Sequence, residues 1–293
     1  MSPADADRRG APRVLRAGRH RLPLGAKTYV MGILNCTPDS FAGDGFAGRP
    51  REAIEAGLRM VDEGADVLDI GGESTRPGSE AVGPAEELQR VIPVIEGLAH
   101  RTPAPLSVDT WKAEVARTAL KAGASIVNDI SGLHFDREMA ETAALAGAAV
   151  VVMHIKGKPR TMQENPQYGD LLAEVKTYLM EGITKARKAG LGDDQIVLDP
   201  GIGFGKRPEH NLELLRRLVD IVSLGFPVLV GPSRKTFIGH LLDQPVEQRL
   251  EGTLAAVAVA IAHGADFVRV HDVAAAHRVR VVADAIVRGA PRP

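Results

Sequence analysis

The stretch Ala122-Gly123-Ala124-Ser125-Ile126-Val127 joins the end of an expected helix to the start of an expected strand. Glycine often follows a helix directly, because it tolerates the left-handed backbone that ends one. The apolar residues after it are typical of a strand that is buried on both faces. The same phrase, Gly-Ala leading into a run of apolar residues, recurs at Gly64, Gly147 and Gly264. This repetition predicts a series of βα units.

Working outward from these positions, short runs rich in Val, Ile and Leu alternate with helix-like segments eight times. Between the first two runs, Ile54, Leu58 and Val61 fall at the spacing of one helix face, which predicts a helix over Arg51–Gly64. Seven further helices are expected to begin near Pro84, Ala113, Arg137, Asp170, Asn211, Arg249 and Ala274. The expected strands are Tyr29–Leu34, Val67–Gly71, Leu106–Val108, Ser125–Val127, Ala149–Met153, Ile196–Leu198, Val228–Val230 and Phe267–Val270.

Eight βα units with right-handed crossovers can close into a (β/α)8 TIM barrel, whose active site lies at the C-terminal ends of the strands. A doubly wound open sheet is the competing α/β architecture, and the absence of G-x-G-x-x-G after the first strand weakens it. We expect a single domain over residues 14–289, with disordered tails at 1–13 and 290–293. The segment Val14–Leu24 is interpreted as a hairpin that closes the barrel floor.

The composition narrows the class of protein. The chain has 293 residues, a net charge of −1 and a pI near 6.8, which argues against a nucleic-acid binder. The single cysteine, Cys36, excludes an intrachain disulfide and a zinc site built from cysteines. No run reaches the ~18 apolar residues of a membrane helix, and no secretory signal is evident. We therefore expect a cytoplasmic protein.

Polar side chains follow nearly every expected strand, at the point where the strand ends. Asp109, Asn128 and Asp199 offer acceptors and donors that suit a flat heterocycle with several N–H groups. Other strand ends carry side chains of the types that bind phosphate or carboxylate, namely Arg76, Lys235, Arg269 and His271. One aspartate after a strand can simply cap the next helix. So many polar strand ends at one barrel mouth predict a site for a heterocycle that carries anionic groups.

Several motifs in this chain resemble, in the same order, those of the dihydropteroate synthases. The resemblance covers roughly Tyr29 to the last helix, and its motifs are strong together although each is weak to moderate alone. The motifs are Met31-Gly32-Ile33-Leu34-Asn35-Cys36-Thr37-Pro38-Asp39-Ser40-Phe41, Gly72-Glu73-Ser74-Thr75-Arg76-Pro77-Gly78, Ser107-Val108-Asp109-Thr110, Asn128-Asp129, Met153-His154, Asp199-Pro200-Gly201-Ile202-Gly203-Phe204-Gly205-Lys206, Gly231-Pro232-Ser233-Arg234-Lys235 and Arg269-Val270-His271-Asp272.

The resemblance implies a transferase of folate biosynthesis. Such an enzyme condenses 6-hydroxymethyl-7,8-dihydropterin diphosphate with 4-aminobenzoate, giving 7,8-dihydropteroate and diphosphate. It also implies Mg2+ as cofactor and a homodimer through the last helices. The charge balance and the short apolar runs already argue against nucleic acid and membrane as partners. Phe41 and Pro77 match positions that contact sulfonamide drugs, so the chain is expected to be a sulfonamide target.

The resemblance also implies roles for individual residues. The catalytic set would be Asp109, Asp199, Lys235, Arg269 and His271. The pterin would be held by Asp109, Asn128, Met153, Asp199, Phe204 and Lys235. The diphosphate would be held by Asn35, Arg269 and His271, with Asn35 also binding Mg2+. The 4-aminobenzoate would contact Phe41, Thr75, Arg76, Pro77 and Thr236, and Asp44 would be an acidic residue of the first loop.

Some residues admit a structural interpretation beside a functional one. His154 can be a core histidine, and Arg234 can be an ion-pair residue rather than a ligand. Trp111 is expected to pack on a helix, and Glu73 to bind a loop backbone. Cys36 is interpreted as a small packing residue.

Two other functions remain open at this level. A pterin-binding methyltransferase acting on methyltetrahydrofolate would share the Asp and Asn pterin set, but it would not need Ser233-Arg234-Lys235 or the anion site at Arg269. A non-catalytic pterin-binding paralogue would keep the fold without the activity, and the intact loop motifs oppose it. A generic phosphosugar enzyme is a more distant alternative.

Overall fold

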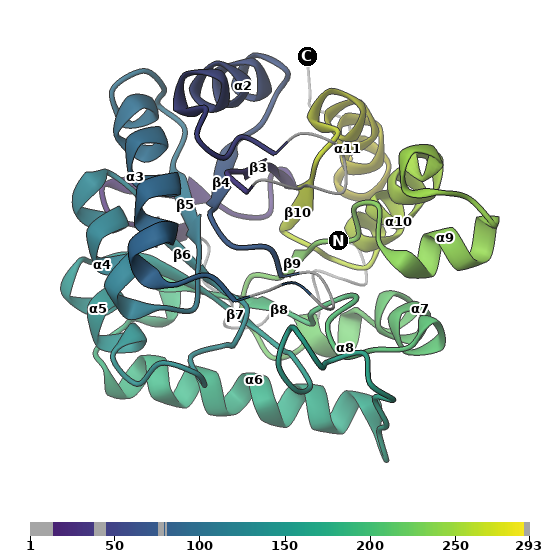
Figure 1. The fold of residues 1–293 in the computed structure, drawn as a ribbon. Coiled ribbons are helices and arrows are strands. Elements are labelled where there is room, and N and C mark those ends of the chain that lie inside the picture. The colour runs from purple at the N-terminus through teal and green to yellow at the C-terminus, as the bar shows by residue number, and fades with distance from the viewer. Residues whose placement is uncertain (1–13, 38–44, 76–78, 80, 290–293) are drawn as a thin grey trace.

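The computed structural model describes residues 14–37, 45–75, 79 and 81–289. The expected tails fall outside them. Eight parallel strands are ringed by helices (Figure 1). The strands are β3 (Tyr29–Asn35), β4 (Val67–Gly71), β5 (Leu106–Asp109), β6 (Ile126–Asp129), β7 (Ala149–Met153), β8 (Ile196–Asp199), β9 (Leu229–Val230) and β10 (Phe267–Val270).

Helices cover the outer face of the sheet. They are α2 (Pro50–Asp62), α3 (Pro84–Ala99), α4 (Ala113–Ala122), α5 (Met139–Leu145), α6 (Leu171–Lys188), α7 (Pro208–Arg216), α8 (Val219–Val222), α9 (Thr236–Leu242), α10 (Leu250–Ala262) and α11 (Val273–Arg288). Two 3-10 turns, η1 (Asp193–Gln195) and η2 (Val246–Gln248), complete the order.

The sheet closes into a barrel. Its order is β8-β7-β6-β5-β4-β3-β10-β9, with every adjacent pair parallel. A bridge between Leu198 and Val228 brings the two edge strands together, and the Leu198 N–H donates to the Pro227 carbonyl at 2.8 Å. The edge strands of a doubly wound sheet stay apart, whereas here the edge strands β8 and β9 are joined. The predicted TIM barrel is therefore confirmed, and the alternative of a doubly wound sheet is wrong.

Side chains alternate between two cores, as they must along a strand. Val30 and Leu34 of β3 point outward into the layer between sheet and helices, while Tyr29 and Met31 point inward. The inward residues near the strand starts are apolar, and β1 (Val14–Ala17) packs against them through Leu15 and Ala17. With β2 (His20–Pro23) it forms the predicted hairpin, which seals the barrel floor.

Most element boundaries agree with the sequence within one or two residues. The larger difference is α7, expected from Asn211 but beginning at Pro208, a residue whose fixed φ suits the first helical position. Strand β6 begins at Ile126 rather than Ser125, and β9 is shorter than expected because Val228 makes only an isolated bridge. Among the described residues, each helix is too short or too polar to cross a membrane.

The glycine that ends α4, Gly123, packs closely against the last residue of α3, Ala99. Gly123 has φ +122°, and a Cβ there would lie 2.6 Å from the Cβ of Ala99; Gly190 has φ +96° with open space around its Cβ position. We expect Gly190→Ala to lower the free energy of unfolding by about 1–2 kcal/mol, from backbone strain alone. Gly123→Ala should lower it by about 1–3 kcal/mol more, through overpacking. Urea unfolding of both variants measures this difference, and equal losses would contradict it.

Candidate functional site

The polar strand ends meet at one mouth of the barrel, above the sealed floor. A cavity of about 490 Å³ opens there, within the range of small-molecule sites. Predicted residues that line it are Asn35, Thr75, Asp109, Phe204, Lys235, Thr236, Arg269 and His271. A narrower pocket at its base is lined by Asp109, Asn128, Met153, Asp199, Phe204, Lys235 and Arg269. The structure therefore brings together every predicted site residue that it describes.

Arg269 lies at the centre of the site, between two carboxylates. Its Nε donates to Asp69 Oδ2 at 2.6 Å, and its Nη2 donates to Asp109 Oδ2 at 2.7 Å. Burial opposes the charge, but Asp69 and Asp109 outweigh it and raise the pKa of Arg269. Arg269 therefore stays a cation, anchored from β10 to β4 and β5.

The pKa of Asp109 is raised well above the usual value of an aspartate. Burial raises the pKa of Asp109 to about 7, against the opposing attraction of Arg269. Its Oδ1 is buried without a hydrogen-bond partner among the described residues. Its other oxygen already pairs with Arg269, so a donor on a ligand would find an acceptor here.

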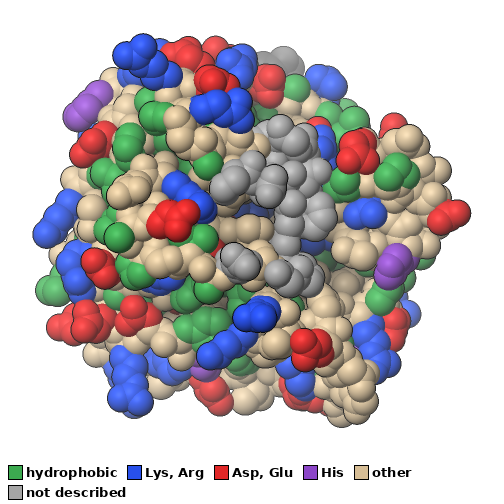
Figure 2. Space-filling view, viewed as in Figure 1, with side chains coloured by type: hydrophobic (Ala, Val, Ile, Leu, Met, Phe, Trp, Pro, Cys, Tyr) green, Lys and Arg blue, Asp and Glu red, His purple; other side chains and the backbone are tan. Residues whose placement is uncertain are grey.

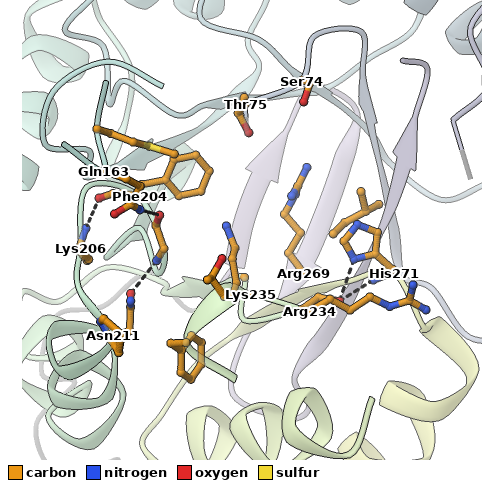
Figure 3. A pocket seen from close by; sticks show the side chains of 18 of the residues that line it. Ser74, Thr75, Gln163, Phe204, Lys206, Asn211, Arg234, Lys235, Arg269 and His271 are labelled. Atoms are coloured by element: carbon orange, nitrogen blue, oxygen red, sulfur yellow. Dashed lines mark hydrogen bonds between the residues drawn. The ribbon is translucent and has the colours of Figure 1, made fainter. Parts of the chain in front are cut away.

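Asp199 and Lys235 form the opposite side of the inner pocket. Burial raises the pKa of Asp199 to about 6, although its Oδ1 accepts the Gly201 N–H at 2.7 Å. Burial also lowers the pKa of Lys235 to about 8, helped by the nearby Arg269 charge. The Lys235 ammonium lies 4.1 Å from the centre of the Phe204 ring. In Figure 3, Lys235 and Arg269 point into the space between Phe204 and His271.

Apolar side chains wall the inner pocket. Met153 and Phe204 are buried in one small cluster with Ile130, Ile155 and Met162. A planar ring between them would meet apolar faces, while its edges would meet Asp109, Asn128 and Asp199. This is the environment that a flat heterocycle with polar edges requires.

The anion end is organised by Ser233 and by the start of α9. The Ser233 hydroxyl lies 2.9 Å from His271 Nδ1 and accepts the His271 N–H at 3.2 Å, so it fixes the position of that ring. Arg234 pairs with Asp272 through two contacts of 2.6 and 3.0 Å, which favours its structural interpretation although it also lines the cavity. Thr236 is the first residue of α9 and is exposed at the mouth.

The second loop is tied to the barrel by a partly buried lysine, Lys112. Lys112 binds the Glu73 carboxylate and lies 2.5 Å from Glu87, while Glu73 Oε1 accepts the Val82 N–H at 2.9 Å. The predicted role of Glu73 as a partner of the loop backbone is confirmed. Of the residues predicted to contact 4-aminobenzoate, Thr75 and Thr236 line the cavity; Phe41, Arg76 and Pro77 lie outside the described residues, as does the loop acid Asp44.

The remaining ambiguous residues take structural positions. His154 is 3% exposed, with Nδ1 lying 2.8 Å from the ammonium of Lys206. Burial and that neighbour lower the pKa of His154 to about 2, so it is neutral. Trp111 packs edge-on against Phe135, with ring centres 6.5 Å apart. Cys36 is buried, and burial raises the pKa of its thiol to about 12, which suits a packing residue.

Three further positions at the site were given no role of their own in the sequence analysis: Asp69, and the motif residues Ser233 and Lys206. Asp69 is a carboxylate inside the otherwise apolar strand Val67–Gly71, a signal that the sequence does contain. Lys206 is buried at the cavity wall, donates to the Phe204 carbonyl at 3.0 Å, and has a pKa that burial lowers. It holds the loop that carries Phe204.

A magnesium ion fits this donor set only if the ligand supplies most of its oxygens. Among the described residues, no cluster of three or more His, Cys, Asp or Glu side chains could hold a metal ion. Asn35 offers one amide oxygen beside Arg269 and His271 in the same cavity. Mg2+ commonly binds through one or two protein oxygens together with phosphate and water, so Asn35 is compatible with it.

The described part of the face drawn in Figure 2 shows no large patch of a single charge. In Figure 2, acidic and basic side chains are interspersed over the face shown. This agrees with the net charge of −1. Inside the cavity, by contrast, Lys206, Lys235 and Arg269 are among the residues that line the wall.

Comparison with known proteins identifies the family. The family described as pterin binding enzyme matches residues 31–271. The dihydropteroate synthase of Synechocystis sp. is 50% identical over 278 residues, covering 94% of this chain and 96% of the relative. A dihydropteroate synthase structure from Yersinia pestis with a sulfonamide drug has a TM-score of 0.90 and 41% identity, covering 93% of this chain and 98% of that one. That of Xanthomonas albilineans with 4-aminobenzoic acid has a TM-score of 0.86 and 45% identity, covering 94% and 98%. The chain therefore belongs to the pterin-binding enzyme family and, within it, to the dihydropteroate synthases.

Proposed function

We propose that the cavity joins 6-hydroxymethyl-7,8-dihydropterin diphosphate to 4-aminobenzoate. The bond between the methylene carbon and the diphosphate oxygen breaks, and a bond from that carbon to the arylamine nitrogen forms. The amine loses one proton and diphosphate leaves. The observation that carries this proposal is that Asp109, Asn128, Asp199 and Lys235 surround one narrow pocket with apolar walls, beside a cavity lined by cationic groups.

The pterin occupies the narrow pocket in this proposal. Its ring lies between Met153 and Phe204, and its polar edge meets Asp109, Asn128 and Asp199. As diphosphate departs, the methylene becomes cation-like and the ring shares the charge. In their ionised forms, Asp109 and Asp199 stabilise that state more than the neutral ground state, and this differential accelerates the reaction.

The diphosphate lies at the cationic end. Arg269 and His271 neutralise the charge that grows on the leaving group, and Asn35 would hold Mg2+ through its amide oxygen. The ion supplies additional neutralisation when it is bound. Ser233 keeps the His271 ring oriented toward this end through its contact with Nδ1.

The 4-aminobenzoate occupies the outer cavity, between Thr75 on the second loop and Thr236 on α9. The Xanthomonas albilineans relative was solved with 4-aminobenzoic acid, which supports this compound as a ligand of the present chain. Its arylamine is already a neutral nucleophile and needs no strong base. Because the Yersinia pestis relative was solved with a sulfonamide drug, we also expect sulfonamides to occupy this subsite.

The experiment that tests the function is diphosphate release by the purified chain. We expect release only when the pterin diphosphate, 4-aminobenzoate and Mg2+ are all present. Removal of Mg2+ by a chelator should slow the reaction strongly, because the leaving group then loses a counter-ion; added Mg2+ should restore the rate. No release under complete conditions would favour the non-catalytic paralogue. Methyl transfer from methyltetrahydrofolate would favour the methyltransferase.

A substitution at Asp199 tests the charge-stabilising role. Asp199→Asn keeps an oxygen for the Gly201 N–H but removes the negative charge near the pterin. We expect the single-turnover rate to fall by roughly 10²-fold, the scale of losing one preorganised electrostatic contact in other enzymes. Affinity for the pterin diphosphate should fall much less. Rapid-quench kinetics measures this, and weaker binding with an unchanged single-turnover rate would sink the role.

We further propose a homodimer formed through α10 and α11, which pack side by side (Figure 1). Four apolar side chains are exposed there: Val259 at 43%, Val281 at 47%, Val282 at 60% and Ile286 at 79%. Together they offer a surface suited to a second copy. We expect twice the chain mass by light scattering at micromolar concentration, and the chain mass for Val282→Lys combined with Ile286→Glu. A wild-type monomer would contradict the proposal.

A cytoplasmic location is part of the same proposal. The one cysteine, Cys36, is a buried free thiol, which suits a reducing compartment. Cell fractionation is the check, and recovery outside the cytoplasmic fraction would refute it.

A further inference from the structure

Asp69 lies beneath the cavity and contacts two of the residues assigned to the substrates. It is wholly buried on the inward face of β4. Its Oδ2 accepts from Arg269 Nε at 2.6 Å and from Asn128 Nδ2 at 2.9 Å. Its Oδ1 is buried and has no hydrogen-bond partner among the described residues. A single carboxylate oxygen thus ties β10 and β6 to β4.

A buried carboxylate lowers the stability of the fold unless its partners offset the free energy lost with its hydration. A charge taken out of water needs a close counter-charge, and Arg269 is the counter-charge of Asp69. Because Asp69 has no exposed surface and does not line either pocket, it cannot reach a ligand directly. Its effect on the reaction must therefore pass through its neighbours, by contact through Arg269 and Asn128 and by its charge through Asp109.

We propose that Asp69 is a positioning residue, which fixes the Arg269 guanidinium and the Asn128 amide in the geometry that pterin diphosphate requires. This inference rests on the function proposed above. Asp69 holds Arg269 at Nε, whereas the contact with Asp109 uses Nη2. The Nε contact is a pivot that persists when the Nη atoms turn toward the diphosphate and Asp109 turns toward the pterin.

Without the pivot, Arg269 keeps only its contact with Asp109. The ion pair then holds Asp109 away from the pterin, and the guanidinium can rotate away from the leaving group. Misplacement of a binding group by about 1 Å can cost about 10²-fold in rate. The Thr75 and Thr236 side of the cavity has no contact with Asp69, so the 4-aminobenzoate subsite should not respond.

The charge of Asp69 also acts on its neighbour Asp109. Four charged groups face Asp109: Arg269 from β10, Asp69 from β4, Glu87 from α3, and Lys235 at the start of α9. Arg269 and Lys235 favour the ionised carboxylate, while Asp69 and Glu87 oppose it. Removal of the Asp69 charge therefore lowers the pKa of Asp109 and keeps it ionised to lower pH.

Asp69→Asn is the informative variant, because it keeps the shape and an acceptor oxygen while removing the charge. We expect kcat/KM for the pterin diphosphate to fall roughly tenfold to 10²-fold. KM for 4-aminobenzoate should stay within about twofold. The acid limb of the kcat/KM profile, which reports groups of the free enzyme, should move to lower pH. Steady-state kinetics with each substrate varied in turn, over a range of pH, measures all three.

Asp129→Asn is the matched control. Asp129 is an equally buried aspartate at the end of β6, but its oxygens accept the Ser131 and Leu133 N–H groups instead of contacting a site residue. We expect it to lower the melting temperature and to leave the pH profile unchanged. If Asp69→Asn loses activity only in proportion to lost folded protein, or changes both KM values equally with an unmoved acid limb, the positioning role is overturned. Asp69→Asn kinetics like those of the wild type would overturn it too.

A double-mutant cycle separates action through Arg269 from a general effect. If Asp69 works through that side chain, the loss from Asp69→Asn should shrink in an Arg269→Lys background, because lysine has no Nε to hold. Fully additive losses would count against the proposal.

A failure of the proposed function would be distinguishable from a failure of the role of Asp69. Diphosphate release by the wild type is measured in the same buffer, and absence of release there refutes the function. The variants must then be compared by binding and not by activity. In that case, calorimetry measures the affinity of each variant for pteroic acid. We expect Asp69→Asn to bind pteroic acid more weakly than the wild type does. Equal binding would refute the role of Asp69 in holding Asn128.

Discussion

The site depends on one buried cation held between two carboxylates. Arg269 bridges Asp69 and Asp109 across residues separated by 200 and 160 positions in the sequence. Any one of these charges alone inside the barrel would be strongly unfavourable. Together they form a network that joins β10, β4 and β5 at the level where the apolar floor ends. Because the positive charge of Arg269 compensates the two negative charges, the barrel can hold these charged side chains above its apolar floor.

The barrel supplies the two environments that the reaction needs, through the alternation of side chains along each strand. Inward positions near the strand starts are apolar and are sealed by the β1–β2 hairpin through Leu15 and Ala17. Inward positions nearer the strand ends carry Asp109, Asn128 and Asp199. The cavity therefore opens at one end only, and it changes from apolar to charged over the length of a few residues.

Several ionisable side chains of the cavity have pKa values that are shifted toward neutral pH. Burial raises the pKa of Asp109 to about 7 and that of Asp199 to about 6, while it lowers the pKa of Lys235 to about 8. The common cause is loss of water, which disfavours charge of either sign. A substrate that brings donors to the carboxylates and negative charge to the lysine reverses this penalty. The low-dielectric pocket thus favours a ligand whose two ends differ in charge.

Much of this could be predicted from the residues alone. The Gly-Ala repeats and apolar runs predicted the barrel, and the polar strand ends predicted Asp109, Asn128, Asp199 and Lys235 as neighbours. They sufficed because strand ends in a parallel barrel face one mouth. Asp69 was not predicted, and Ser233 and Lys206 appeared only as members of motifs, without a role of their own. An aspartate within an apolar strand signals something unusual, but one strand does not reveal which buried partner will share its charge.

The sequence by itself determined the order of the elements, the spacing that puts polar side chains at strand ends, and the family to which those motifs belong. Tertiary structure decided the pairings: Asp69 with Arg269 and Asn128, Lys206 with His154, and Lys112 with Glu73 and Glu87. It also decided the pKa values, since these depend on burial and on charges contributed by other strands. The physical reason is that local sequence sets backbone conformation, whereas a buried charge is governed by whichever distant groups the closed barrel places around it.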